Sequence, residues 1–297
     1  KNKKFEITEE RLYLHYCVNH LGNYIDHIIK YYCFIGGVMY IDFHTHGKLA
    51  KKLPFSKTYT DLMFEKAHQR GLDAICLTEH FNTLSFDVMY DYIYNKYQHS
   101  GDCIITDHGL LVFFGMEVDI YEGGHTLVIG RYDDIVELNQ KLDNHKTKET
   151  FLPFDKLVLL LENYDILFGA GHPFRQGGNI PKLTSEQLQH FDFFDLNGKD
   201  LANDSKQTKR LVYNLAKQYH KPVLSGSDTH QGTQYGCVKT NFKNSFNTLS
   251  ELRNEIKKGN YQIEIADSIK IQVEDATIQK RLLKEVHRLG GDYVSLL

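Results

Sequence analysis

The sequence predicts an α/β fold in which strands and helices alternate and the strands close into a barrel related to the eight-fold parallel type. Three observations indicate this fold. The chain contains seven short apolar runs, most of them are separated by helical patterns, and its 297 residues suit one such barrel. Ligands bind beyond the carboxyl ends of the strands in these folds, so functional residues are expected there.

Five of the apolar runs end on residues that can bind a metal or move a proton. They are 40–47, with His44 and His46; 74–80, with Glu79 and His80; 111–117, with Glu117; 166–173, with His172; and 222–230, with Asp228 and His230. The other two runs are 125–130 and 193–198. Because the carboxyl ends of parallel strands share one rim, the polar residues of five strands are expected to converge.

Helical patterns fill most of the intervals. The first, 60–70, begins with Thr-Asp and stops before a glycine, as expected of an N-cap and a glycine stop. The other expected helices are 136–142, 154–164, 185–190, 205–218 and 248–258.

The chain is expected to have three parts: an N-terminal extension (1–38), the barrel (39–260), and a C-terminal strand and helix packing on it (261–297). The extension is either a short helical appendage or not native, if translation starts at Met39. In the last part, 262–273 alternates like a pair of edge strands. An amphipathic helix is expected at 277–289, covering the lower face of the barrel.

The first motif, His44-Thr45-His46, favours a metal site. On a strand the two histidines share one face, and imidazole suits zinc, manganese or iron. The pair alone would be compatible with two exposed histidines. The chemistry at the ends of the other strands favours the metal site.

Five ordered motifs resemble the PHP (polymerase and histidinol phosphatase) family. They are His-X-His at 44–46, Thr-Glu-His at 78–80, Gly-X-Glu at 115–117, Gly-His-Pro at 171–173 and Gly-Ser-Asp-X-His at 226–230. This resemblance implies a distorted (β/α)7 TIM-like barrel with a metal cluster at the C-terminal rim of the strands. It also implies two or three divalent metal ions (Mn, Zn or Fe) and hydrolysis of phosphate esters.

The resemblance also implies which residues bind the metals. The groups are His44, His46, Glu117 and Asp228 for one ion; Glu117, as a bridge, and His172 for a second; and His80 and His230 for a third. His125 is expected to be a further ligand of the second ion because of its position at a strand start after two glycines, although an exposed turn residue is the alternative.

The chain departs from the family pattern in two places. No histidine occurs in 47–55, where the family commonly has one, so the number of metals is left at two or three. Glu79 replaces the usual aspartate and is expected to contact a ligating histidine or the metal. In the same stretch, Lys48, Lys51 and Lys52 are expected to form a solvated face.

The chemistry expected of this cluster is attack on phosphorus by a hydroxide shared between metals that Glu117 bridges. The expected catalytic residues are Asp228, His230 and Arg175. Arg175 has the fork geometry for two phosphate oxygens, although a solvated loop arginine is the alternative. His230 or a metal-bound water could protonate the leaving group. Lys199 is a further candidate at the rim.

Composition narrows the function classes. A net charge of −3 argues against a dedicated nucleic-acid-binding protein, without excluding short nucleotides. The five cysteines lack a CxxC spacing, which suits reduced thiols and a cytoplasmic location. No membrane association is expected, because the apolar stretch 31–40 is too short to span a bilayer.

The expected function is therefore that of a metal-dependent phosphoesterase acting on a small phosphate monoester, similar to histidinol phosphate or a nucleotide. Activity should fall below about pH 6, where free imidazole is protonated. Two alternatives stay open: an amidohydrolase-like enzyme that cleaves C–N bonds on the same metal barrel, and a non-catalytic metal-binding PHP module.

Overall fold

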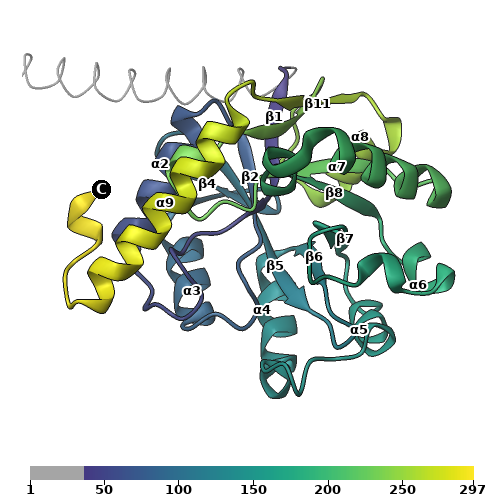
Figure 1. Ribbon diagram of the computed structural model, residues 1–297, viewed down its shortest axis with the longest axis horizontal. Coiled ribbons are helices and arrows are strands. Elements are labelled where there is room, and N and C mark those ends of the chain that lie inside the picture. Colours follow the sequence, from purple (N-terminus) through teal and green to yellow (C-terminus); the bar gives the residue numbers. More distant parts are fainter. Residues whose placement is uncertain (1–36) are drawn as a thin grey trace, which may run out of the picture. The chain divides into compact units, whose positions relative to one another are not determined.

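Seven strands that follow one another around a nearly closed sheet form the frame of the molecule (Figure 1). The structure is a computed structural model that describes residues 37–297, and residues 38–297 form one compact unit. The frame strands are β1 (Met39–Thr45), β2 (Ala74–Leu77), β5 (Leu111–Asp119), β6 (His125–Gly130), β7 (Leu167–Gly171), β8 (Phe193–Asn197) and β9 (Val223–Gly226). The predicted α/β barrel is confirmed. The expected extension lies outside the described residues, apart from Gly37 and Val38.

The sheet nearly closes where the segment after β9 meets β1. The amide of Asp228 donates to the carbonyl of His44 at 2.7 Å, and the amide of His46 donates to the carbonyl of Thr229 at 3.1 Å. A register shift between Asp42 and Thr45 in the pairing of β1 with β2 marks a bulge. Bulges often redirect side chains beside functional sites, and this one coincides with the His-X-His motif.

One frame strand runs against the expected direction. β6 is antiparallel to both β5 and β7, whereas the pairs β1–β2, β2–β5, β7–β8 and β8–β9 are parallel. The reason is the short connection 120–124, in which Gly123 and Gly124 have positive φ and no helix can cross over. The start of β6, not its end, therefore lies at the rim with the carboxyl ends of its neighbours.

The helices include all six that were predicted between the strands. The described α-helices are α2 (Lys57–Gln69), α3 (Phe86–Lys96), α4 (Tyr132–Lys141), α5 (Phe154–Leu161), α6 (Ser185–Gln189), α7 (Gly198–Tyr219), α8 (Leu249–Lys258) and α9 (Ile269–Arg288); short 3-10 turns are η1 (Asp143–His145), η2 (Ile180–Lys182), η3 (Gly232–Gln234) and η4 (Val294–Leu296). Helix α3 was not predicted, since tyrosine and β-branched residues lower its helix propensity.

Four further strands extend the frame. A hairpin of β3 (Gln98–Ser100) and β4 (Cys103–Ile105) joins the edge of β5, while β10 (Val238–Phe242) pairs antiparallel with β1 and then with β11 (Tyr261–Ile265). The strand pair expected over 262–273 is therefore wrong beyond Ile265. The chain instead enters α9 at Ile269, because apolar residues from there on recur at helical spacing.

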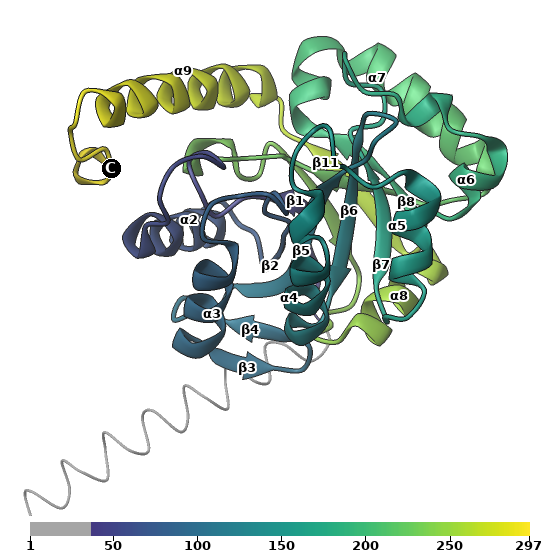
Figure 2. The same cartoon turned by 90° about the horizontal axis from the view of Figure 1, so that it is seen from below.

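The C-terminal helix also lies elsewhere than expected. α9 packs on α7 and on η3, the turn that directly follows Asp228-Thr229-His230. It therefore borders the carboxyl rim of the barrel, and the prediction that it covers the lower face is wrong. Figure 2 shows α9 starting beside α7 and running towards the side that carries α2.

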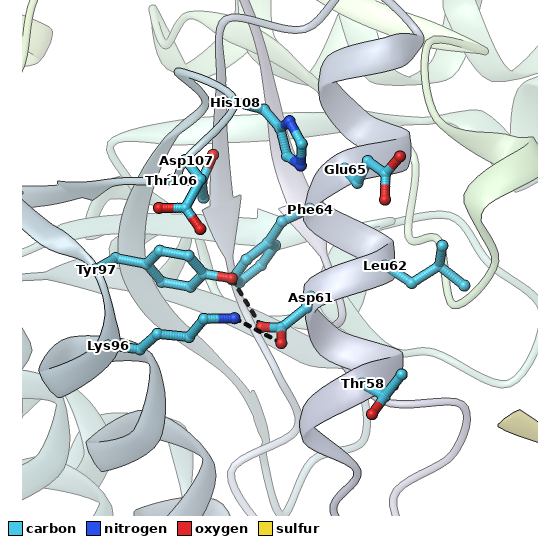
Figure 3. A pocket seen from close by; sticks show the side chains of 10 residues that line it. All are labelled: Thr58, Asp61, Leu62, Phe64, Glu65, Lys96, Tyr97, Thr106, Asp107 and His108. Carbon is cyan, nitrogen blue, oxygen red and sulfur yellow. Dashed lines mark hydrogen bonds and ion pairs between the residues drawn. The ribbon is translucent and has the colours of Figure 1, made fainter. Parts of the chain in front are cut away.

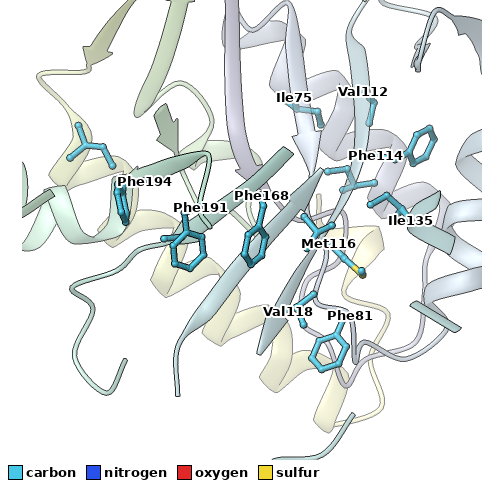
Figure 4. Close-up of a cluster of buried hydrophobic side chains, with 14 of the residues drawn as sticks. Ile75, Phe81, Val112, Phe114, Met116, Val118, Ile135, Phe168, Phe191 and Phe194 are labelled. Atoms are coloured by element: carbon cyan, nitrogen blue, oxygen red, sulfur yellow. The ribbon is translucent and has the colours of Figure 1, made fainter. Parts of the chain in front are cut away.

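The core lies between the sheet and its helices. Side chains of β2 and β5, including Ile75, Phe114 and Met116, pack with helix residues such as Ile135 of α4 (Figure 4). A second group around Phe168, Phe191 and Phe194 fills the β7–β8 side, and the rings of Phe168 and Phe191 stack with centroids 4.9 Å apart. These contacts fix the positions of the strands whose carboxyl ends carry the polar residues predicted to bind metals.

Candidate metal centre

The structure brings all the predicted metal ligands together at the carboxyl rim. We call this group the histidine–carboxylate cluster; it comprises His44, His46, His80, Glu117, His125, His172, Asp228 and His230. Its side chains come from β1 and the residue directly after it, from β5 and β6, and from the segments after β2, β7 and β9. All but two are buried, the exceptions being half-buried His80 and His125. The reversed direction of β6 is what places His125 here.

Glu117 lies at the centre of the cluster. Its carboxylate contacts imidazoles at His44 (Nε2, 3.6 Å), His46 (Nε2, 3.5 Å), His80 (Nδ1, 2.8 Å), His172 (Nε2, 3.0 Å) and His125 (Nδ1). The other ring nitrogen of His125 lies 2.9 Å from Asp119. A carboxylate with imidazoles on both of its oxygens has the position of a bridging ligand.

Three groups of ligand atoms are close enough to share an ion. They are His44, Glu117 and His172; His44, His46 and Asp228; and His46, His80 and His230, with the atoms of each group within 4.8 Å of one another. His46 thus joins His80 and His230, although 47–55 has no histidine. His125 is in none of these groups. The roles of all these residues as metal ligands stay predictions.

The cluster also contains buried nitrogen and oxygen atoms that lie near one another but, within residues 37–297, form no hydrogen bond. Among the described residues, Nε2 of His44, both ring nitrogens of His46, Nδ1 of His80 and Oε2 of Glu117 form no hydrogen bond. An unsatisfied buried polar atom costs about 1–3 kcal/mol, so several of them side by side need a common explanation. A histidine and carboxylate donor set fits Zn, Mn or Fe, and such ions would satisfy these atoms.

The charges of the cluster favour a bound cation. Burial acts to raise the pKa of Glu117, but His125, His80 and His44 hold it well below its usual value. Burial likewise acts to lower the pKa of His44, yet Glu117 and Asp195 raise it to about 10. The pKa of His125 is also raised to about 10, by Glu117 and Asp119 against the effect of burial. Glu117 is thus ionised and holds protons on nearby imidazoles, protons that a metal would replace.

Two histidines of the cluster are neutral. Burial and the charge of Arg175 lower the pKa of His172 to about 4. Burial and nearby His46 lower the pKa of His230 well below its usual value. Nδ1 of His230 lies 2.9 Å from the carbonyl of Lys48, which leaves Nε2 as the acceptor for a metal.

Asp195 is a supporting residue that the sequence analysis missed. Its Oδ2 lies 3.1 Å from Nδ1 of His44 and accepts the amide of His172 and the side-chain amide of Asn197, each at 3.0 Å. A carboxylate on the second nitrogen of a ligating histidine fixes its tautomer and orientation. Its place two residues before Asn197, on the same face of a predicted strand, was an available signal.

Glu79 and Lys48 support the other side of the cluster. Oε1 of Glu79 lies 3.5 Å from Nδ1 of His46, and Oε2 accepts the amide of Lys48 at 3.2 Å. The ammonium of Lys48 donates to Thr83 and to the carbonyl of Leu84. The prediction that Lys48 belongs to a solvated face is wrong, since only 2% of it is exposed. The bend at Gly47 turns it inward, while Lys51 and Lys52 stay near the surface.

Two cations contact Asp228. Nη1 of Arg175 lies 2.5 Å from Oδ2 and Nζ of Lys199 lies 2.9 Å from Oδ1. Arg175 also donates to Asp200 at 2.9 Å and to Asn197 at 2.6 Å, so the alternative of a solvated loop arginine is wrong. These cations hold the pKa of Asp228 well below its usual value, against the effect of burial.

Backbone strain also falls at the cluster. Asp228 has φ 54° and His172 has φ 28°, conformations that residues other than glycine rarely adopt. Such conformations cost about 1–3 kcal/mol and concentrate at functional sites, where the surroundings enforce them.

A separate hollow lies between α2 and the segments 96–97 and 106–108 (Figure 3). Its carboxylate Asp61 accepts hydrogen bonds from Tyr92 and Tyr97, each at 2.7 Å, and pairs with Lys96 at 2.6 Å. These polar groups satisfy one another, so we assign the hollow to packing between α2 and α3.

Comparison with known proteins identifies the family. The model of the PHP domain matches residues 42–268, which is most of the chain. No curated protein matches. Among residues 37–297 no helix has the length and apolar character needed to cross a membrane.

Solved structures share the fold. PsfC from Pseudomonas syringae PB-5123 aligns with a TM-score of 0.67 at 20% identity, over 83% of this chain and 99% of PsfC. The lesion-specific endonuclease Q from Pyrococcus furiosus aligns with a TM-score of 0.60 at 21% identity, over 76% of this chain and 57% of the endonuclease. The chain thus spans less than two thirds of endonuclease Q. With the family match and the histidine–carboxylate cluster, we conclude that this chain belongs to the PHP domain family and is a metal-dependent hydrolase of that family.

Proposed function

We propose that this protein is a phosphoesterase that hydrolyses the phosphate monoester of a small molecule. The observation that carries the proposal is the contact of Arg175 and Lys199 with Asp228, itself a candidate metal ligand. Two cationic side chains therefore lie beside the place where a substrate would meet the metals. A phosphate dianion needs such charge, whereas a neutral amide does not.

The residues of the cluster would have distinct tasks. When bound, two or three divalent ions would supply Lewis acidity that activates water and neutralises phosphate charge. The histidines, Glu117 and Asp228 would hold these ions. Arg175 and Lys199 would share their hydrogen bonds between Asp228 and the phosphate oxygens. Neutral His230, with its Nδ1 on a backbone carbonyl, suits a ligand better than a proton donor.

A phosphodiester in DNA is the second candidate. The barrel resembles that of endonuclease Q, which was solved with a 27-mer duplex substrate carrying an abasic lesion at the active site; that alignment has a TM-score of 0.57 and 19% identity. Two features of this chain favour a small substrate instead. Its net charge is −3, and α9 borders the rim that a duplex would have to approach.

The test compares hydrolysis of p-nitrophenyl phosphate with that of its bis ester, with Mn, Zn or Fe added. We expect metal-dependent turnover that favours the monoester. Asp228→Asn should lower it at least about 100-fold, because loss of a ligand should exceed the 10–100-fold cost of losing a residue that supports one. Asp133→Asn, an exposed site on α4, is the matched control and should leave turnover unchanged.

Other outcomes would separate the alternatives. A preference for the bis ester would replace the monoester proposal with nuclease-like action. Two or more bound metals without turnover of either ester would favour cleavage of C–N bonds. A protein that binds no metal and hydrolyses neither ester would be a non-catalytic module.

A further inference from the structure

The inward face of α9 carries a lysine among apolar residues. Ile269, Ala276 and Leu283 are the buried residues of this helix, spaced at seven residues along one face. Lys280 follows Ala276 by about one helical turn and precedes Leu283 by slightly less, so it belongs to the same face. If position 280 served only to pack α9 against the barrel, an apolar residue would be expected there.

The position of α9 directs this lysine towards the cluster. α9 packs on η3, just after His230, and on α7, which begins beside Lys199. The charge of Lys280 is repelled by that of Lys199 and attracted by those of Asp228 and Glu79. It also lowers the pKa of His230. Burial is the largest effect on Lys280 and lowers its pKa to about 8.

Lys280 has no partner that would account for its placement. Within residues 37–297 it forms neither a hydrogen bond nor an ion pair, whereas Arg175 and Lys199 both contact Asp228 directly. A half-buried ammonium that has no anion in direct contact costs free energy unless a ligand supplies one. The ammonium of Lys280, at the rim that carries the histidine–carboxylate cluster, is therefore available to bind an anion from outside the chain.

We propose that Lys280 is a substrate-binding residue whose ammonium group donates to a non-bridging oxygen of the phosphate held at the histidine–carboxylate cluster. This assignment rests on the proposed function and deepens it. Lys280 lies beyond the segment 42–268 that matches the family model, so the C-terminal helix adds its own contact to the family barrel. A third cation suits a terminal phosphate with two negative charges better than a diester with one.

The experiment uses the full chain loaded with metal and compares Lys280→Met with Lys280→Arg. The matched control is Lys270→Met, an exposed lysine at the start of the same helix. Binding of inorganic phosphate is measured by calorimetry, and KM is measured for p-nitrophenyl phosphate and its bis ester. Metal content and melting temperature are recorded for each variant.

We expect Lys280→Met to weaken phosphate binding about tenfold, the effect of one charge-assisted hydrogen bond. KM for the monoester should rise by a similar factor, and KM for the bis ester should change less. Lys280→Arg should retain most of the affinity, and Lys270→Met should match the wild type.

Three results would overturn the assignment. If Lys280→Met binds phosphate as the wild type does while both hydrolyse the monoester, Lys280 does not bind substrate and the proposed function stands. Loss of bound metal or of thermal stability in Lys280→Met would show a structural role instead. If the metal-loaded wild type neither binds phosphate nor hydrolyses either ester, the proposed function fails, and this assignment fails with it.

Discussion

His44 and Glu117 illustrate how individual residues of the cluster depend on one another. The pKa of His44 rises to about 10 and that of Glu117 falls, because each stabilises the charged form of the other in a buried site. Neither shift follows from the residue type alone. The same mutual attraction keeps the carboxylate ready for a metal and places a proton where the metal would bind.

Asp195→Asn tests the support of a ligand at the scale of one residue. The substitution keeps the shape of the side chain but removes the charge next to Nδ1 of His44. We expect metal affinity to fall about 10–100-fold, because such partners orient a ligating histidine and increase its basicity. Competition with a chelator measures the affinity, and the exposed Asp133→Asn is again the control. Equal affinity in both variants would contradict this role.

Among the elements, β6 and β1 have the largest influence on the site. The tight turn before β6 reverses its direction and brings His125 to the rim, and the bulge in β1 coincides with the start of the His-X-His motif. β9 approaches β1 closely at Gly226. A Cβ atom at Gly226 would lie 2.3 Å from Cβ of His44 and 2.8 Å from Oδ1 of Asp195.

Gly226→Ala tests this close approach of two strands. We expect the free energy of unfolding to fall by about 1–3 kcal/mol, as for other overpacked cores, and metal affinity to fall because His44 must move. Thr248→Ala is the control: it removes the capping box of α8 and should cost about 1 kcal/mol. Urea denaturation and metal titration measure both effects. A metal affinity that falls equally in the two variants would assign the loss to instability alone.

For the whole molecule, the cluster depends on closure of the barrel. Its candidate ligands come from strands at both ends of the sheet, and the contact of Asp228 and Thr229 with β1 brings these ends together. An unfolded chain would hold none of these ligands in place. Metal binding should therefore stabilise the folded barrel as a unit.

Removal of metal should lower the melting temperature, and the difference should grow with pH. At a metal concentration about 100 times Kd, one site contributes about 2.7 kcal/mol. Below about pH 10 the metal-free fold keeps protons on His44 and His125, which the metal must displace. As pH rises this competition weakens, and the stability that these protons give to the metal-free fold is lost. Melting curves with metal and with a chelator at about pH 6, 7.5 and 9 measure this difference; equal curves at every pH would contradict it.

The sequence by itself determined the seven frame strands, six of the helices and the residues of the cluster. These are local properties: a short apolar run predicts a strand, and a polar residue at its end predicts a position on the rim. His44 and His46 could thus be predicted from eight consecutive residues. The number and identity of the metals, the division of the chain at residue 260 and the cytoplasmic location stay predictions.

Only the tertiary structure decided what depends on neighbours distant in the sequence. These features are the antiparallel direction of β6, the position of α9 at the rim and the burial of Lys48. They also include the contacts of Asp195 with His44 and of Arg175 with Asp228. None of these has a local pattern, because each results from which strands pair and which helix covers them. The side chains proposed to bind a metal are thus apparent in the sequence, whereas those proposed to position the metal and its substrate are set by packing across the barrel.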